Sequence, residues 1–366
     1  MKVRKFTLFL IIVLGLVVAL QVVAQHSLAD GNLSPTTSSI VAAEDSLPVS
    51  STVTSGGQPE NGYITNEGNL PPSALSIVPE LPIPNDPYLD NQWALSQVQV
   101  FELWSATTGN PEILVAVLDT GIDGDHEDLK GKVVTVANFA DSSTTNDIHG
   151  HGTHIAGIIA AECDNGIGIT GVAPECRLMN VKVADDKGRC QPLAVAEAIV
   201  WAVDNGANVI NISIEFREPS PQLEDAVNYA WGQGVIIIAA AGNDGSQSPT
   251  YPAYYENSIA VAASKQDDTL APLSNYGNWV DVAAPGFNIY STLPDDSYGY
   301  KTGTSFAAAY VSGLAALLFH VVTDSDGDGR LNGEVRAAIE AGCQEISING
   351  VGTGRINAAN SITEIR

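Results

Sequence analysis

The chain alternates short, uninterrupted apolar runs with segments of helical periodicity. The apolar runs are rich in Val and Ile and cover residues 113–118, 178–183, 209–213 and 235–240. Runs of this length are typical of strands that are buried on both faces of a parallel sheet. Helical patterns occupy residues 153–161, 193–204, 222–231 and 305–320. The alternation predicts an α/β fold, a doubly wound, mostly parallel sheet with helices on both faces, whose site lies at the carboxyl ends of the strands.

The N-terminal segment, residues 1–24, has the pattern of a signal peptide. Lys2, Arg4 and Lys5 precede a long apolar run that ends near Ala24, where small residues offer a cleavage site. The alternative is an uncleaved membrane anchor, because the run is close to spanning length. Either way, we expect the rest of the chain outside the cytoplasm, secreted or held at the cell surface; only an uncleaved segment would bring it to a membrane.

Residues 25–80 are rich in Ser, Thr, Pro, Gly and Asn and show little periodicity. This composition predicts a flexible linker or pro-segment. A folded domain is expected over residues 81–366. It carries most of the formal charge of −26, since 42 acidic residues face 16 Lys and Arg. Such a surface repels phosphate backbones, so nucleic acid is excluded as an expected partner, whereas divalent cations are favoured.

Four cysteines, Cys163, Cys176, Cys190 and Cys343, could form two disulfides in an exported chain, in any of three connectivities. None lies in a CxxC or Cys/His metal pattern. The alternative is that they are free or structural.

Four segments carry residues suited to nucleophilic catalysis. Asp119 follows a buried strand, His151 lies in His-Gly-His-Gly-Thr-His before a helix, and Ser305 begins a helix rich in Ala. Asn243 follows another buried strand and a glycine, so its amide could stabilise an oxyanion. Each has a plain structural alternative: turn residues for the Asp and Asn, an N-cap for the serine, and a metal site for the histidines. The metal alternative lacks a nearby carboxylate or thiolate of the HExxH kind.

Together the four segments resemble the subtilisin-like serine proteases, and the likeness extends from about Asn85 to the C-terminus. The segments 85–88, 226–231 and 251–255 are similar to the thermitase branch. The chain order Asp, His, Ser is a known property of that family. The resemblance implies a serine endopeptidase in which Asp119 orients His151, His151 is general base and acid, and Ser305 is the nucleophile. Asn243 and the Ser305 backbone N–H would hold the oxyanion.

Two other functions fit the same resemblance. A catalytically silent relative would serve as a binding module, although all four chemical positions are filled. A transpeptidase would share the acyl-enzyme but exclude water, and no lid insertion supports it.

The resemblance also implies a cleft for extended polypeptide substrates, which would add to the enzyme as a strand. It implies a monomer with residues 81–366 as the peptidase domain. The cleft is expected to have two walls and a specificity pocket floored by small residues, with room for a large apolar side chain. These residues are Ser213, Ile214, Glu215, Gly188, Arg189, Cys190, Ala240, Ala241 and Gly242.

Glu215 departs from the family pattern, because the chain reads Ser213-Ile-Glu-Phe where Ser-Leu-Gly-Gly is usual. We expect its carboxylate to point to solvent. The alternative is that it selects a basic side chain in the substrate.

Calcium is the cofactor that the resemblance implies, with a structural role. A first site would combine the carboxylates of Asp86 and Asp128 with the Asn165 side chain and three backbone oxygens. The backbone oxygens are those of Glu162, Ile167 and Ile169. The thermitase branch's second site, before the catalytic His, is degraded, with Asn138, Ser142 and Ser143 where acids are expected.

A separate calcium loop is predicted from the residues themselves. Asp324, Asp326 and Asp328 have the acidic spacing of an EF-hand loop, followed by a glycine at its sixth position. Glu334 falls at position eleven instead of twelve. The alternative is a solvated acidic turn.

Overall fold

The computed structural model describes residues 39–40 and 83–363. The predicted signal peptide and nearly all of the predicted pro-segment lie outside the described residues. No helix in the described part of the chain is both long and apolar enough to cross a membrane.

A seven-stranded sheet forms the centre of the fold, with strand order β3-β4-β2-β6-β7-β8-β9. Every neighbouring pair in it is parallel. The predicted doubly wound parallel sheet is therefore confirmed. The strands are β2 (Leu114–Asp119), β3 (Val133–Asn138), β4 (Arg177–Lys182), β6 (Val209–Ile212), β7 (Ile236–Ala240), β8 (Ser258–Ser264) and β9 (Val282–Pro285).

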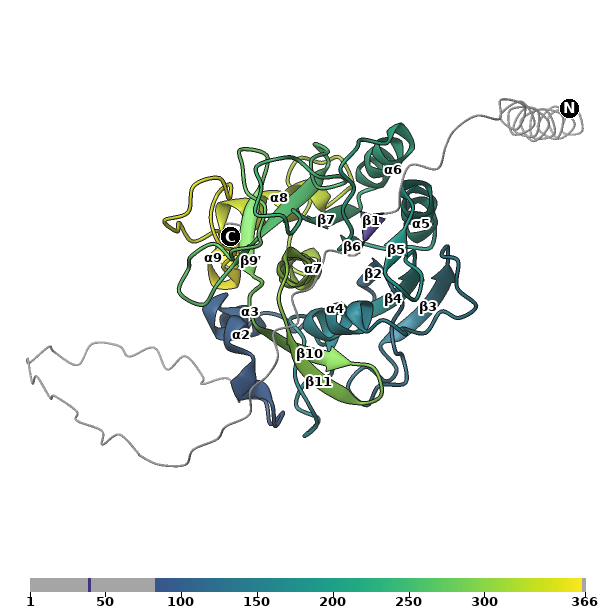
Figure 1. Ribbon diagram of the computed structural model, residues 1–366. Coiled ribbons are helices and arrows are strands. Elements are labelled where there is room, and N and C mark those ends of the chain that lie inside the picture. The colour runs from purple at the N-terminus through teal and green to yellow at the C-terminus, as the bar shows by residue number, and fades with distance from the viewer. Residues whose placement is uncertain (1–38, 41–82, 364–366) are drawn as a thin grey trace, which may run out of the picture. The chain divides into compact units, whose positions relative to one another are not determined.

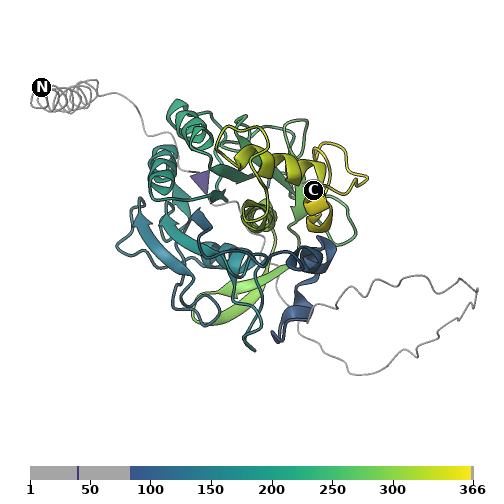
Figure 2. The ribbon, with the colours of Figure 1, turned by 180° about the vertical axis from the view of Figure 1, so that it is seen from behind.

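Helices cover both faces of the sheet (Figures 1 and 2), α4 and α7 on one and α5 and α6 on the other. The side chains of β2 divide accordingly: Val115 and Val117 belong to the core under α4 and α7, whereas Ala116 and Leu118 pack with α5 and α6. The continuous apolar run thus reflects burial on two sides. The helices are α4 (His151–Ala160), α5 (Pro192–Asp204), α6 (Pro221–Gly232) and α7 (Thr304–Phe319).

Shorter elements complete the domain. The strands β10 and β11 form an antiparallel hairpin, and β1 pairs antiparallel with β5. Their bounds are β1 (Ser39–Ile40), β5 (Arg189–Cys190), β10 (Ile289–Leu293) and β11 (Ser297–Lys301). The remaining helices are η1 (Leu89–Asn91), α2 (Trp93–Gln97), α3 (Val100–Trp104), α8 (Asn332–Ala341) and α9 (Ala358–Thr363).

The helix starts follow from local sequence. Pro221 occupies the first turn of α6, where no backbone N–H is required, and the Ser220 side chain accepts a hydrogen bond from the Leu223 N–H at 3.4 Å. α4 has a different start, because Gly150 before it adopts the left-handed conformation at φ 86°. That conformation favours glycine and turns the chain sharply into the helix that begins with His151.

Candidate active site

Asp119 and His151 form the most direct contact of the site. Asp119 is the last residue of β2, at the carboxyl end of a central strand, and His151 is the first residue of α4. Their side chains are both 1% exposed, and Nδ1 of His151 lies 2.7 Å from Oδ1 of Asp119. A carboxylate in this position fixes the imidazole tautomer with the proton on Nδ1, so Nε2 is left to act as a base.

Asp147 holds the start of α4 in place, a role that the sequence reasoning missed. Its Oδ1 accepts hydrogen bonds from the backbone of His149 and Gly150 and from the Thr120 hydroxyl, at 2.8–3.0 Å. Its Oδ2 accepts from both the backbone and the hydroxyl of Thr153. An acidic residue a few positions before a helix is the signal that could have revealed it.

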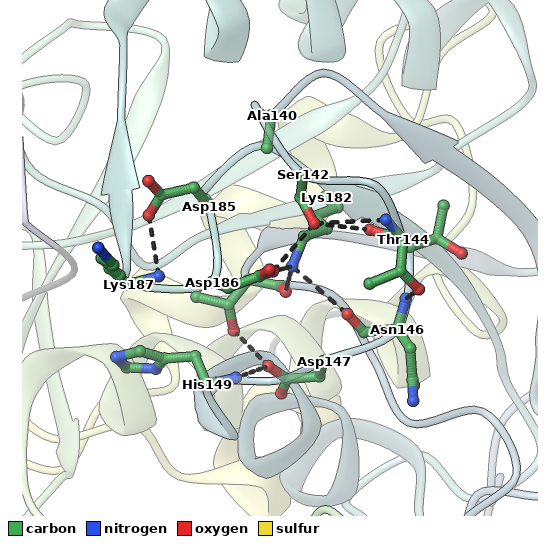
Figure 3. Close-up of polar contacts among 12 residues, drawn as sticks. Ala140, Ser142, Thr144, Asn146, Asp147, His149, Lys182, Asp185, Asp186 and Lys187 are labelled. Atoms are coloured by element: carbon green, nitrogen blue, oxygen red, sulfur yellow. Dashed lines mark hydrogen bonds and ion pairs between the residues drawn. The ribbon is translucent and has the colours of Figure 1, made fainter.

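Lys182 is the last residue of β4, and its side chain reaches the loop that precedes His151 (Figure 3). Its side chain is fully buried, and its ammonium group is 3.0 Å from Oδ1 of Asp186 and 3.4 Å from the Asn146 carbonyl oxygen. It also donates to the carbonyl of Thr120. The loop therefore contains its own cation, bound by a carboxylate and by carbonyl oxygens.

The residues expected at the degraded thermitase-type site serve this loop internally. Ser142 donates a hydrogen bond to Asp186 at 2.9 Å, as Figure 3 shows. Asn138 accepts from the backbone of Ala140 and donates to the carbonyl of Ser142. Their side chains are thus engaged in the loop's own hydrogen bonds.

Ser305 lies in the first turn of α7, where backbone N–H groups favour developing negative charge. Its Oγ is buried and makes no hydrogen bond within the described structure. The ring of the next residue, Phe306, lies 5.5 Å from the His151 ring, so the two segments meet. Ser213, just beyond β6, donates its hydroxyl to the Ser305 carbonyl at 3.2 Å. A buried hydroxyl without a hydrogen bond is uncommon in a structural role.

Asn243 is oriented by the residue before the serine. Its Oδ1 accepts hydrogen bonds from the backbone N–H of Thr304 at 2.9 Å and from the Thr304 hydroxyl at 3.0 Å. Because the oxygen is fixed in this way, the amide Nδ2 remains as a donor near the start of α7. Thr304 was not singled out from the sequence, although its place before Ser305 could have indicated it.

His154, the other histidine at the start of α4, has a structural environment. Its Nε2 donates to the Gly299 carbonyl at 3.1 Å, and its ring lies 4.7 Å from that of Phe306. Burial lowers its pKa well below the ordinary value, so the imidazole is neutral.

One wall of the expected cleft is the short strand β5. β5 consists of Arg189 and Cys190, and its edge pairs antiparallel with Ser39 and Ile40 of β1. The preceding Gly188 is in the left-handed region at φ 74°. This edge therefore accepts an extended segment as an added strand, which is the mode expected for a polypeptide substrate.

Glu215 does not point to solvent, so that expectation was wrong. Its Oε2 is buried without a hydrogen-bond partner among the described residues. The carboxylate reaches Gly242, where a Cβ, if the residue had one, would collide with Oε2. Ala240 ends β7, and Ala241 and Gly242 follow it where a floor of small residues was predicted. The Glu215 carboxylate occupies space above this floor, so a large apolar side chain of the substrate has less room than expected.

Asp86, Asp128 and Asn165 lie together, as the first calcium site requires. Asp86 accepts hydrogen bonds from the backbone of Asp164 and Asn165, and Asp128 accepts from Ile169. Burial raises the pKa of both carboxyl groups, that of Asp128 to about 6. Neither forms an ion pair with a Lys or Arg among residues 83–363. Buried acidic groups in this state suit a divalent cation.

The remaining predicted ligands of that site border the same two carboxylates. The Glu162 N–H donates to the Asp128 carbonyl at 2.9 Å, and Asn165 donates its amide to Asp128 at 2.9 Å. The Asn165 oxygen accepts from Ile167. Binding a cation through that oxygen would require the Asn165 amide to rotate.

The acidic loop after α7 gathers a different set from the one predicted. Asp324, Asp326 and Glu334 each place a carboxylate oxygen within 4.8 Å of the others. Asp328 instead forms an ion pair with Arg330 at 2.5 Å. Asp324 also accepts hydrogen bonds from Gly327 and Gly329, which shape the turn.

All four cysteines are free, so the two possible disulfides do not form. Burial raises the pKa of each thiol, to about 12 for Cys190 and about 11 for the others. Thiols in this state are poor nucleophiles. Ser305 is therefore the better candidate for covalent chemistry.

The arrangement as a whole contains a carboxylate, an imidazole, a hydroxyl and an amide donor at the carboxyl ends of β2 and β7 and the starts of α4 and α7. These are the groups that acyl transfer through a serine requires.

Comparison with known proteins gives a consistent result. The profile of the subtilase family matches residues 110–340. A thermophilic serine proteinase of Bacillus sp. (strain AK1) is 45% identical over 76% of this chain and 69% of its own length. Thermitase of Thermoactinomyces vulgaris is 43% identical over 76% of this chain and 99% of its own. The solved structure of a protease from Pseudoalteromonas arctica superposes with a TM-score of 0.71 at 28% identity, covering 77% of this chain and 99% of that one. The chain therefore belongs to the subtilase family, is most similar in character to its thermitase-like members, and is a serine endopeptidase.

Proposed function

We propose that Ser305 is the nucleophile of this endopeptidase, with His151 as its base and Asp119 as the residue that orients the base. The observation that carries the proposal is the 2.7 Å contact between Oδ1 of Asp119, at the end of β2, and Nδ1 of His151, at the start of α4, with both side chains buried. The His151 ring also lies 5.5 Å from the ring of Phe306, the residue after Ser305.

The chemistry follows from these positions. As the Ser305 oxygen attacks a peptide carbonyl, Nε2 of His151 takes the hydroxyl proton, because serine is a poor nucleophile without a base. Asp119 stabilises the imidazolium that forms. His151 then gives the proton to the leaving amine, and the acyl-enzyme on Ser305 is hydrolysed by water through the same steps in reverse order.

Asn243 and the Ser305 backbone N–H would stabilise the oxyanion. Support comes from Thr304, which holds Oδ1 of Asn243 and so keeps the donor Nδ2 available before the substrate arrives. Removal of such a donor lowers the rate by about 10²–10³, a magnitude measured on a subtilisin and not obtained from this chain.

The substrate would be an extended polypeptide that pairs with the Gly188–Cys190 wall and passes the wall of Ser213, Ile214 and Glu215. The pairing of β1 with β5 supports this, because it places an extended segment on the same edge. The substrate side chain on the amino side of the cleaved bond would enter above Ala240, Ala241 and Gly242.

Calcium would be held by Asp86 and Asp128, with Asn165 and the backbone oxygens of Glu162, Ile167 and Ile169. The buried carboxylates without a Lys or Arg partner support this assignment. A second ion would be held by Asp324 and Asp326, with Glu334 in the position where Asp328 was expected. Calcium would compensate buried charge at the first site and clustered exposed carboxylates at the second, and would stabilise the fold.

The enzyme would act outside the cytoplasm as a monomer, with residues 1–24 as its export signal, residues 25–80 as linker or pro-segment and residues 81–366 as the peptidase domain. The basic and apolar pattern of residues 1–24 supports export.

Labelling with a fluorophosphonate tests the proposed roles. We expect the full chain to hydrolyse casein and to incorporate one label, at Ser305, with loss of activity. The Ser305→Ala variant should do neither, while its melting temperature stays close to that of the parent. Labelling at another residue, or casein hydrolysis by the Ser305→Ala variant, would refute the assignment. A folded chain without either activity would favour the silent binding module.

A further inference from the structure

The position of the reacting carbonyl defines where one substrate side chain must go; this step rests on the proposed function. The carbonyl carbon must lie near Ser305 Oγ and its oxygen near Asn243. The side chain on the amino side of the cleaved bond branches from the next atom, so it enters beside Gly242, the residue before Asn243. Gly242 has no side chain and a φ of 102°, so neighbouring residues supply the side-chain atoms that line this entry.

Glu215 is the charged residue at that entry. It lies two residues after Ser213, whose hydroxyl contacts the Ser305 backbone. Its Oε2 is buried, has no hydrogen-bond partner in the part of the chain that is described, and fills the position that a Cβ on Gly242 would take. The carboxylate therefore lies between the two segments that flank the substrate side chain.

Glu215 forms no ion pair with a described Lys or Arg. Arg217, two residues further on, has a 77% exposed side chain and pairs instead with Asp244 at 3.0 Å. Asp244 adds negative charge near the same entry. Burial, followed by the charge of Asp244, raises the pKa of Glu215 to about 7, while Arg217 and the Asn243 backbone oppose the change. A buried carboxylate in this state is stabilised by any cation that reaches it.

We propose that Glu215 makes this protease select Lys or Arg on the amino side of the bond that it cleaves. A long cationic side chain can pass Gly242 and donate hydrogen bonds to Oε2, which no residue of the enzyme satisfies within the described ranges. An aromatic or aliphatic side chain would leave the carboxylate unpaired and would deprive it of water. The acidic surface, with a formal charge of −26, also favours the approach of basic polypeptides.

Peptide substrates that differ at this one residue test the proposal. The peptides carry Arg, Lys, Phe, Leu or Ala and are compared at about pH 8.5, where a carboxyl with a raised pKa is ionised. We expect kcat/KM for the Arg or Lys peptide to exceed that for the Phe peptide by about 10- to 100-fold. This is the range for a hydrogen bond to a charged group. Glu215→Gln, which keeps the shape, should lower the ratio to near one. Glu215→Gly should raise turnover of the Phe peptide. Glu218→Gln, an exposed acid three residues on, is the matched control and should retain the preference.

Two outcomes would overturn the proposal. One is equal cleavage after Phe and Arg in the parent, unchanged in Glu215→Gln. The other is cleavage only after Ala, which would mean that Glu215 closes the pocket. Binding of Arg and norleucine peptides to the Ser305→Ala variant, measured by calorimetry, separates selectivity from turnover. If the Ser305→Ala variant binds the Arg peptide more tightly, and Ser305→Ala/Glu215→Gln does not, the proposal holds even if the assigned triad is wrong. Equal binding of the two peptides by the Ser305→Ala variant would refute it.

Discussion

The loop before His151 and the loop of residues 162–169 each pack against buried charge, and this charge is compensated differently in the two regions. In the first, Lys182 is an internal cation that contacts Asp186 and the carbonyl oxygens of Thr120 and Asn146. In the second, Asp86 and Asp128 are buried acids that no Lys or Arg of residues 83–363 neutralises.

The difference shows which part of the molecule should depend on the ions and the pH of the solution. The Lys182 cluster is complete as soon as the chain folds, so the position of His151 should not depend on ions. The Asp128 cluster has excess negative charge, so its stability should vary with calcium and pH. Three predictions test this contrast.

The largest effect is expected from Lys182→Met. The substitution keeps most of the apolar volume but leaves the Thr120 and Asn146 carbonyls without their buried donor. We expect a loss of about 3–5 kcal/mol in the free energy of unfolding, because the two carbonyls each lose a charged donor, at about 1–3 kcal/mol each. Urea titrations in the Ser305→Ala background, which prevents self-digestion, would measure it with and without calcium.

Lys187→Met, at an exposed position five residues after Lys182, is the control for that experiment and should change stability little (Figure 3). A loss in Lys182→Met that calcium restored would contradict the view that this cluster is independent of ions.

Removal of calcium should have the next largest effect. A ligand that binds only the native state at about 100 times its Kd adds about 2.7 kcal/mol, so EDTA should lower the melting temperature by several degrees. Asp128→Asn should remove most of this response, and Asp324→Asn should remove a smaller part, since its loop is exposed. If the melting temperature of the parent did not change with EDTA, neither calcium assignment would survive.

The smallest effect is expected at Glu215, a third buried acid without a counter-ion. Its pKa of about 7 in the folded chain lies above the ordinary value of 4.5. The folded state therefore binds more protons than the unfolded state between these values, and stability falls as pH rises from about 4.5 to about 7. Glu215→Gln removes this dependence. Relative to the parent, its gain should grow from about pH 4.5 and level off above about pH 7, with an upper limit of about 3 kcal/mol. Parallel pH profiles of the two proteins would argue against a buried, unpaired carboxylate.

Much of the fold could be predicted because its central strands are buried on both sides. The expected run at 235–240 corresponds to β7 (Ile236–Ala240), and the expected helix at 305–320 corresponds to α7 (Thr304–Phe319). β8 (Ser258–Ser264) was not predicted, because it has only two β-branched residues, Ile259 and Val261, among small residues that also suit a helix. β3 (Val133–Asn138) is partly exposed, so its apolar pattern is weak.

The site was predictable where its chemistry lies in one segment and less so where it depends on distant partners. The motifs of Asp119, His151 and Ser305 predicted segments that do meet in space. The orientation of Glu215 depends on Gly242, and the role of Lys182 depends on carbonyls that the loop presents only when folded. Neither relation leaves a local pattern in the sequence.

The pairing of Ser39 and Ile40 with β5 has a kinetic consequence. A segment of the same chain that occupies a strand edge competes with a substrate at a fixed effective concentration, because both belong to one molecule. Dilution of the protein does not weaken such competition, whereas it does release a separate inhibitor. An intact chain should therefore begin turnover slowly at every protein concentration, and should reach its full rate only after the connection between residues 40 and 83 has been cut.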